Sequence, residues 1–311
     1  MTLRIRTVAG DVAPSSVGRV LPHEHLLCDL SLLSGSLDHV LNDWRLAADE
    51  LRLAMSAGVT CVVDVTTPDM ARDPDGLRKI AAATGAQVVM GTGWYREPYY
   101  PPHIDRSSVS DIAGAMIAEL VNGVPSQDGV AVRAGIIGEI GSHASFVSAQ
   151  EERVFRAAGV ASAATGAPVT THTGIHPTGT RQADLLLGEG ALASRIVVGH
   201  ADMFLDDDYH DDVLARGVWL QFDTTGRVHL NPDERRADAV IRLVRAGYID
   251  QLLLSSDRCF RSDLTAFGGV GYAHTVTSFR DQLLQRGLTT AEFDQLTRTN
   301  PLRMLAWVDP G

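Results

Sequence analysis

The sequence predicts a (β/α)8 barrel, an α/β fold in which eight parallel strands alternate with helices around a closed cylinder. Short runs rich in valine, isoleucine and leucine alternate with longer segments of helical periodicity along the chain. This alternation favours parallel strand pairing with right-handed crossovers. Eight such units in 311 residues fit one closed barrel, a single domain over residues 1–311, better than the alternative of a doubly wound sheet.

The strands are predicted from β-branched apolar runs, each bounded by a polar or glycine-containing junction. In chain order they are expected at Gly18–His23, Val59–Val65, Gln87–Gly93, Ala134–Ile140, Pro168–His172, Arg195–His200, Val218–Asp223 and Gln251–Ser256. A short N-terminal β-hairpin that begins with residues 3–7 is expected to cover the bottom of the barrel.

The helices are predicted from apolar residues that recur with helical spacing between these strands. They are expected at Trp44–Ala57, Gly76–Thr84, Asp111–Val121, Gln150–Thr165, Arg181–Leu187, Tyr209–Arg216, Pro232–Ala246 and Tyr272–Gln285, with an extra C-terminal helix near Thr290–Trp307. Gly58, Gly166 and Gly247 follow helices directly, where a left-handed residue turns the chain toward the next strand.

Charge and cysteine content exclude several classes of protein. The 27 basic residues, of which only Lys79 is a lysine, oppose 38 acidic ones, and the net charge of −11 argues against nucleic acid or an anionic membrane as a partner. No apolar run reaches the ~18 residues of a membrane span, and the N-terminal residues lack the core of a signal peptide. Three cysteines, Cys28, Cys61 and Cys259, indicate free thiols. We therefore expect a cytoplasmic enzyme with a small-molecule substrate.

Six ionisable residues stand at the carboxyl ends of predicted strands, where barrel enzymes build their active sites. His23 and His25 share one face at the end of the first strand because side chains in a strand alternate with a period of two. The other four follow the fourth, fifth, sixth and eighth strands, as Glu139, His172, His200 and Asp257.

Four imidazoles and two carboxylates buried at one barrel mouth need a compensating partner. One catalytic zinc normally takes three protein ligands, whereas two divalent metal ions that share a bridging carboxylate and a bridging hydroxide would use all six residues. Such a hydroxide attacks a polarised carbonyl or phosphoryl centre near neutral pH. Histidine and carboxylate ligands suit zinc, our first expectation, and also manganese, cobalt, nickel and iron.

Several motifs then show a resemblance that extends over nearly the whole chain. They are Pro22-His23-Glu24-His25, Ala134-Gly135-Ile136-Ile137-Gly138-Glu139-Ile140-Gly141, Thr170-Thr171-His172-Thr173, Gly199-His200-Ala201-Asp202, Gly268-Gly269-Val270-Gly271-Tyr272 and Asn300-Pro301. In this order they resemble the phosphotriesterase family of the amidohydrolase superfamily. The best-known members bridge their metals with a carboxylated lysine, but Lys79 falls on a helix after the second strand. A glutamate at the bridging position resembles the phosphotriesterase homology, phosphotriesterase-related and lactonase-like branch.

The resemblance implies a role for each residue. His23, His25 and Asp257 would hold the buried metal, His172 and His200 the more exposed one, and Glu139 would bridge them. Asp257 would also accept the proton of the nucleophile, and Tyr95 matches a tyrosine that lactonase-type members place beside the scissile carbonyl. The family also implies a homodimer.

The substrate is expected to carry an anionic group, because Arg96, Arg227, Arg258 and Arg261 follow the third, seventh and eighth strands at the same mouth. Of these, Arg227, Arg258 and Arg261 are the main candidates for substrate binding. Opening of a lactone or ester is the leading reaction. Alternatives are amide hydrolysis of small N-acyl amino acids or N-acyltaurine-like compounds and, less favoured, weak promiscuous phosphotriesterase activity, since Met203 and Thr224 replace the proton-relay residues of organophosphate-hydrolysing members.

Overall fold

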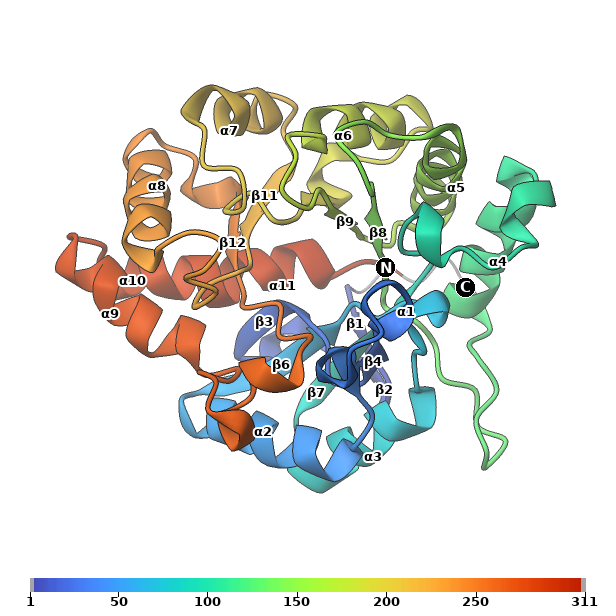
Figure 1. Cartoon of the computed structure of the whole chain (residues 1–311), viewed down its shortest axis with the longest axis horizontal. Helices are drawn as coiled ribbons and strands as arrows, with labels where there is room; N and C mark the ends of the chain where they lie inside the picture. Colours follow the sequence, from blue (N-terminus) through green and yellow to red (C-terminus); the bar gives the residue numbers. More distant parts are fainter. Residues whose placement is uncertain (1–2, 309–311) are drawn as a thin grey trace.

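The computed structural model describes residues 3–308, in which eight parallel strands form one sheet surrounded by helices (Figure 1). Neighbouring strands in the sheet follow one another in the chain, as a singly wound barrel requires. The strands are β3 (Arg19–Glu24), β6 (Val59–Asp64), β7 (Gln87–Thr92), β8 (Ile136–Gly141), β9 (Val169–His172), β10 (Ile196–Val198), β11 (Trp219–Phe222) and β12 (Leu252–Leu254). The predicted barrel is confirmed, and each strand end lies within two residues of its expected position.

The first and last strands meet without a regular ladder, and side chains join them instead. The Ser255 hydroxyl accepts from the His23 amide at 3.0 Å and lies 2.9 Å from the His23 carbonyl. The amide of Asp257 also donates to the His23 carbonyl, at 3.1 Å. Closure of the barrel therefore brings the end of β3 next to the segment after β12.

The junction between β3 and the segment after β12 is called the seam below. The fully buried Glu24 stabilises it. One carboxylate oxygen accepts from the Ser255 hydroxyl at 2.7 Å and from the amide and hydroxyl of Ser256 at 2.8 and 2.7 Å. The other oxygen accepts from the Arg258 amide at 2.9 Å. The carboxylate thus accepts from donors of three residues in the segment that follows β12.

Helices cover the outside of the sheet, as Figure 1 shows. They are α2 (Trp44–Ser56), α3 (Pro74–Thr84), α4 (Val109–Val121), α5 (Ala149–Thr165), α6 (Gly179–Gly188), α7 (Asp207–Leu214), α8 (Asp233–Arg245), α9 (Ser278–Gln285), α10 (Thr290–Asp294) and α11 (Asn300–Leu305). The C-terminal helix expected near Thr290–Trp307 is α10 and α11, joined by the π-helical turn Gln295–Thr299.

The expectation of a helix over Tyr272–Gln285 is wrong at its start. Helix α9 begins at Ser278, after a 3-10 turn over His274–Val276. One contact holds the preceding residues elsewhere, because the Tyr272 hydroxyl donates to the His25 carbonyl at 2.8 Å. The backbone of Thr277 also lies outside the helical region, with φ −119° and ψ −94°. Helical periodicity in the sequence does not reveal such a tertiary contact.

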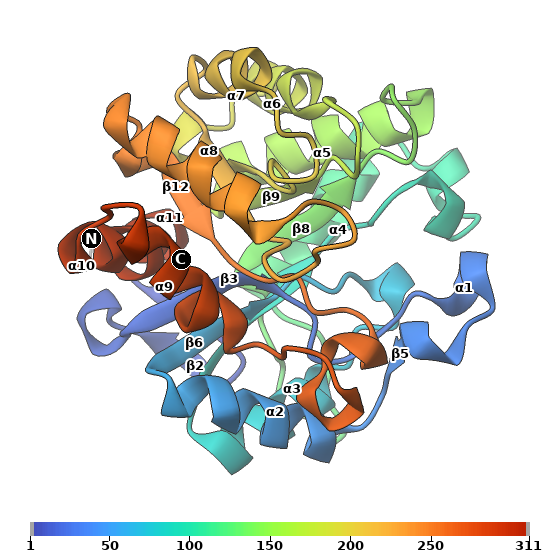
Figure 2. The ribbon, with the colours of Figure 1, turned by 60° about the vertical axis from the view of Figure 1, so that its left-hand side comes forward.

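A second difference is an excursion after β3 that the sequence pattern did not predict. It consists of β4 (Cys28–Asp29), helix α1 (Ser31–Ser34) and β5 (Val40–Leu41), and Figure 2 shows α1 projecting at the right-hand edge of the molecule. The strands are too short for periodicity to be visible in the sequence.

The bottom of the barrel is covered by both ends of the described chain. The predicted N-terminal hairpin is present as β1 (Ile5–Thr7) and β2 (Gly10–Val12). Arg4 and Trp307 exchange backbone hydrogen bonds of 2.9 and 3.0 Å. Cys28, Cys61 and Cys259 are all buried free thiols, as expected. Over residues 3–308, no helix combines the length and apolarity needed to cross a bilayer.

We predict that Glu24→Ala lowers the free energy of unfolding by about 2–4 kcal/mol, because it leaves buried backbone donors of the seam without an acceptor. Urea unfolding of metal-free protein measures this loss. The matched control is Glu234→Ala, which removes an exposed carboxylate from α8 and should change stability by less than about 0.5 kcal/mol. Equal stability of the two variants would show that the seam does not depend on Glu24.

Candidate metal centre

The carboxylate of Glu139 lies between four histidine side chains at the carboxyl end of the barrel. Its Oε1 is 3.2 Å from His25 Nε2, and its Oε2 is 3.3 Å from His23 Nε2. The same Oε2 is 3.1 Å from His172 Nδ1 and 3.4 Å from His200 Nε2. One carboxylate therefore touches both groups of histidines that the sequence analysis assigns to two metal ions.

Asp257 completes the group from the segment after β12. Its Oδ1 is 3.4 Å from His25 Nε2 and 3.7 Å from His23 Nε2, while its Oδ2 accepts from Arg227 at 2.9 Å. Among described residues other than glycine, only Ala71, His200 and Asp257 have a positive φ. Two of these three belong to the cluster, which is consistent with the concentration of strained backbone at functional sites.

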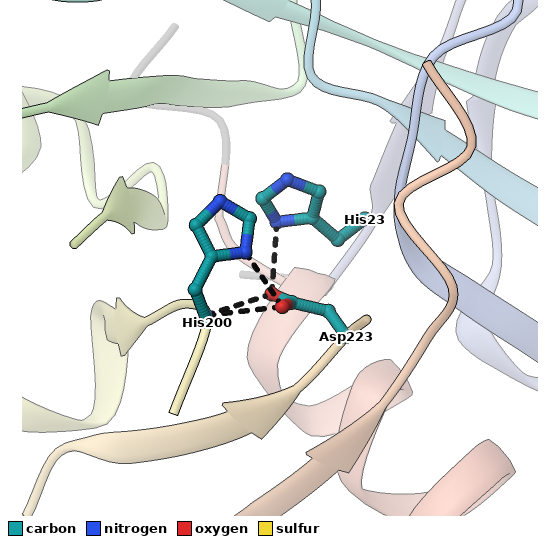
Figure 3. A group of neighbouring side chains, drawn as sticks. All are labelled: His23, His200 and Asp223. Carbon is teal, nitrogen blue, oxygen red and sulfur yellow. Dashed lines mark hydrogen bonds and ion pairs between the residues drawn. The ribbon is translucent and has the colours of Figure 1, made fainter. Parts of the chain in front are cut away.

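Asp223 is a member of this cluster that the sequence analysis did not identify. It follows β11, and Figure 3 shows its carboxylate between His23 and His200. Its Oδ1 is 2.7 Å from His200 Nδ1, and its Oδ2 is 3.3 Å from His23 Nδ1. A carboxylate on the far nitrogen of an imidazole orients the ring of a metal ligand and raises its basicity. The sequence could have identified Asp223 as a site residue by its position at the end of a predicted strand, which it shares with the six predicted residues.

The acids of the cluster favour positive charge among the imidazoles. Burial alone would lower the pKa of His25, but Asp257 and Glu139 raise it to about 10. Asp223 and Glu139 similarly raise the pKa of His23 and His200 against the effect of burial. His172 differs, because burial and the neighbouring His200 lower its pKa to about 4, so that it is neutral at pH 7.

The donor set fits divalent cations. Three overlapping groups of side chains each bring their ligand atoms within 4.8 Å of one another, and these groups are His23–His25–Glu139, Glu139–His172–His200 and His23–His200–Asp223. Both ring nitrogens of the fully buried His23 lie 3.3 Å from a carboxylate oxygen, but neither forms a well-aligned hydrogen bond to it, which leaves them suited to bind a cation. Imidazole and carboxylate donors at this spacing match the requirements of zinc and related metals.

A cavity of about 350 Å³ opens above this cluster. Its lining includes His25, Glu139, His172 and Asp257 together with apolar side chains, so that the cluster forms its inner end. The Tyr95 hydroxyl reaches the same place and lies 3.3 Å from His172 Nε2. Burial and the charge of Glu139 raise the pKa of Tyr95 well above its usual value, which keeps the hydroxyl protonated as a donor.

The structure distinguishes between the arginines that were expected to bind substrate. Arg227 lines the cavity but is paired with Asp257 and, at 3.1 Å, with Asp263. Arg258 is 1% exposed and donates to the carbonyls of Gly271 and Thr225, away from the cavity.

Arg261 also lies outside the cavity and donates to the Val40 carbonyl at 2.8 Å. The structure therefore does not place Arg258 or Arg261 in the lining of the cavity, and backbone carbonyls engage their guanidinium groups instead. The remaining arginine, Arg96, does line the cavity.

Comparison with known proteins gives an independent view of the site. The model of the phosphotriesterase family matches residues 3–305. A crystal structure of the phosphotriesterase homology protein from Escherichia coli, complexed with phosphate in its active site, is 35% identical, with a TM-score of 0.89 over 93% of this chain and 99% of that one. A mutant of a phosphotriesterase-like lactonase from Deinococcus radiodurans is 30% identical, with a TM-score of 0.85 over 97% and 99% of the two chains. The N-acetyltaurine hydrolase of Rattus norvegicus is 29% identical over 98% of each chain.

We predict that Asp223→Asn weakens metal binding about 10- to 100-fold, because the amide no longer holds the far nitrogens of His23 and His200 as a charged acceptor. Titration of the metal-free protein with Zn²⁺ in the presence of a competing chelator measures the change. Asp212→Asn on the exposed side of α7 removes the same charge and should leave the affinity unchanged. Unaltered affinity in Asp223→Asn would contradict a role in orienting ligands.

We also predict that Zn²⁺ affinity falls about tenfold or more for each pH unit below pH 8, since protons compete with the cation for the imidazole nitrogens. The raised pKa of His23, His25 and His200 places this competition in the neutral range. Calorimetric titrations between pH 8 and pH 6 measure the slope. His143→Gln, which alters an exposed histidine, should leave it unchanged, whereas a flat profile would count against histidine ligation.

Proposed function

The chain belongs to the phosphotriesterase family and is a hydrolase, and we propose that it opens a lactone or a carboxylic ester in a reaction that depends on two divalent cations. The six predicted residues would hold these cations, with Glu139 between them and zinc as the first expectation. When bound there, divalent cations polarise a carbonyl group and make water more acidic. The expected homodimer stays a prediction.

Asp257 is suited to move the proton in this reaction. Burial opposes its ionisation, but Arg227 and the neighbouring histidines hold the pKa of its carboxyl below the usual range. The group is therefore ionised at neutral pH, with Oδ2 fixed by Arg227 and Oδ1 facing the histidines. Oδ1 accepts the proton of the attacking water and returns it to the leaving oxygen, so that hydroxyl adds to the acyl carbon as the C–O bond breaks.

The observation that carries the choice of a lactone or ester is the placement of Tyr95. Its hydroxyl lies beside His172 at the inner end of the cavity, where it can donate a hydrogen bond to a carbonyl oxygen that gains charge. A ring alkoxide is also a better leaving group than an amine, which must be protonated as it departs. The similarity to a Deinococcus lactonase supports the same class.

Amide hydrolysis is the second candidate, and full-length similarity to an N-acetyltaurine hydrolase favours it. Phosphotriester hydrolysis has less support. Met203 lines the cavity with a thioether, and the hydroxyl of Thr224 is already engaged with Asp202 and Arg236 at 2.9 Å each. Neither residue provides an ionisable group for a proton relay.

We predict that γ- and δ-lactones give the highest kcat/KM in a panel that also contains N-acetyltaurine, N-acyl amino acids and paraoxon, assayed with Zn²⁺ or Mn²⁺. Asp257→Asn should lower kcat by about 10²–10⁴-fold, because it removes the proton acceptor. Tyr95→Phe should lower kcat about tenfold or more if its hydroxyl stabilises the developing oxyanion. Faster turnover of the amides than of every lactone and ester would establish the second candidate instead.

A further inference from the structure

Arg96 differs from the other arginines near the cavity because it lines the cavity and has no carboxylate partner among the described residues. Arg227 is paired with two carboxylates, and Arg258 and Arg261 lie outside the cavity. Arg96 lines the cavity together with Glu139 and His172. Within residues 3–308 it forms no ion pair with any carboxylate, and its buried Nε has no hydrogen-bond partner.

Two tyrosine rings hold this guanidinium in place. Its central carbon is 4.8 Å from the ring centre of Tyr95 and 5.5 Å from that of Tyr99. The rings are themselves fixed, because the Tyr99 hydroxyl donates to the Leu30 carbonyl at 3.1 Å and the Tyr95 amide donates to Asp69 at 3.0 Å. A guanidinium held on aromatic faces is pre-organised and loses little freedom when it binds a ligand.

The ring of Tyr95 lies between Arg96 and the histidine cluster. Tyr95 contacts His172 through its hydroxyl and Arg96 through its face. The cavity therefore has the cluster of histidines and carboxylates at its inner end and a positive group on the far side of Tyr95.

We propose that Arg96 recognises a single negative charge, a carboxylate or a sulfonate, on the part of the substrate remote from the hydrolysed bond. This inference rests on the proposed function and specifies its substrate class. One guanidinium fork pairs with two oxygens of one anionic group. A phosphate dianion carries a second charge, and Arg227, the other arginine among the described residues of the cavity lining, is already paired with Asp257 and Asp263.

The test compares γ-lactones whose four-carbon side chain ends in a methyl, a carboxylate, a sulfonate or a phosphate group. Arg96→Met keeps the length of the side chain on the tyrosine rings but removes its charge. We expect it to lower kcat/KM for the carboxylate or the sulfonate about 10- to 100-fold, mainly through KM, and to change that of the methyl compound by less than about threefold. The preferred anion in the unmodified protein identifies which of the two groups is recognised.

Two further variants keep the comparison interpretable. Arg96→Lys retains one charge without the fork and should show an intermediate loss, so that the proposal stays testable if Arg96→Met does not fold. Arg181→Met removes an exposed arginine from α6 and should behave as the unmodified protein toward all four lactones. Equal losses on charged and neutral lactones in Arg96→Met would assign Arg96 to packing alone, and preference for the phosphate would overturn the single charge.

A binding measurement separates this inference from the proposed function. Calorimetric titration with 1-pentanesulfonate needs no turnover, and Arg96→Met should weaken binding about tenfold or more relative to the unmodified protein and to Arg181→Met. If no lactone or ester is hydrolysed but this loss is observed, the proposed reaction fails while the role of Arg96 stands. If lactones are hydrolysed but sulfonate binds equally to all three proteins, the role of Arg96 is refuted.

Discussion

The contact of one buried carboxylate with four imidazoles is the interaction on which the rest of the site depends. Glu139 is 2% exposed and touches nitrogens of His23, His25, His172 and His200, which come from three different strands or the residues that follow them. An ionised group at this depth is tolerated only when all of its oxygens are paired. The barrel meets this condition by ending several strands at one level, so that side chains from distant parts of the chain converge on one point.

The other buried carboxylates near Glu139 are each paired with a different set of donors. Asp223 pairs with the far nitrogens of two histidines, Asp257 divides its oxygens between His25 and Arg227, and Glu24 binds backbone and hydroxyl donors of the seam. Each acid thus has its own partners. Of the two arginines that line the cavity, Arg227 is paired with carboxylates, and Arg96 has no carboxylate partner among the described residues.

The barrel and the six cluster residues could be predicted because they depend on local pattern and strand position. Apolar runs marked the strands to within two residues, and the period of two placed His23 and His25 together. The pairing of Arg227 with Asp257, and the binding of Arg258 and Arg261 to backbone carbonyls, could not be predicted. Such contacts depend on how side chains meet in the folded protein, and no periodicity or spacing in the sequence indicates them. The same reason explains the late start of α9, which depends on Tyr272 reaching His25.

The seam between β3 and β12 has a consequence for the order of assembly. It joins His23 to Ser255, which are 232 positions apart in the chain, and it sets Asp257 beside the first two histidines. A nascent polypeptide emerging from the ribosome can present His23, His25, Glu139, His172 and His200 long before the last strand has been made. A metal ion that bound during translation would thus meet a site without Asp257. The site would be complete only after the eighth strand, β12, had been synthesised and had joined β3.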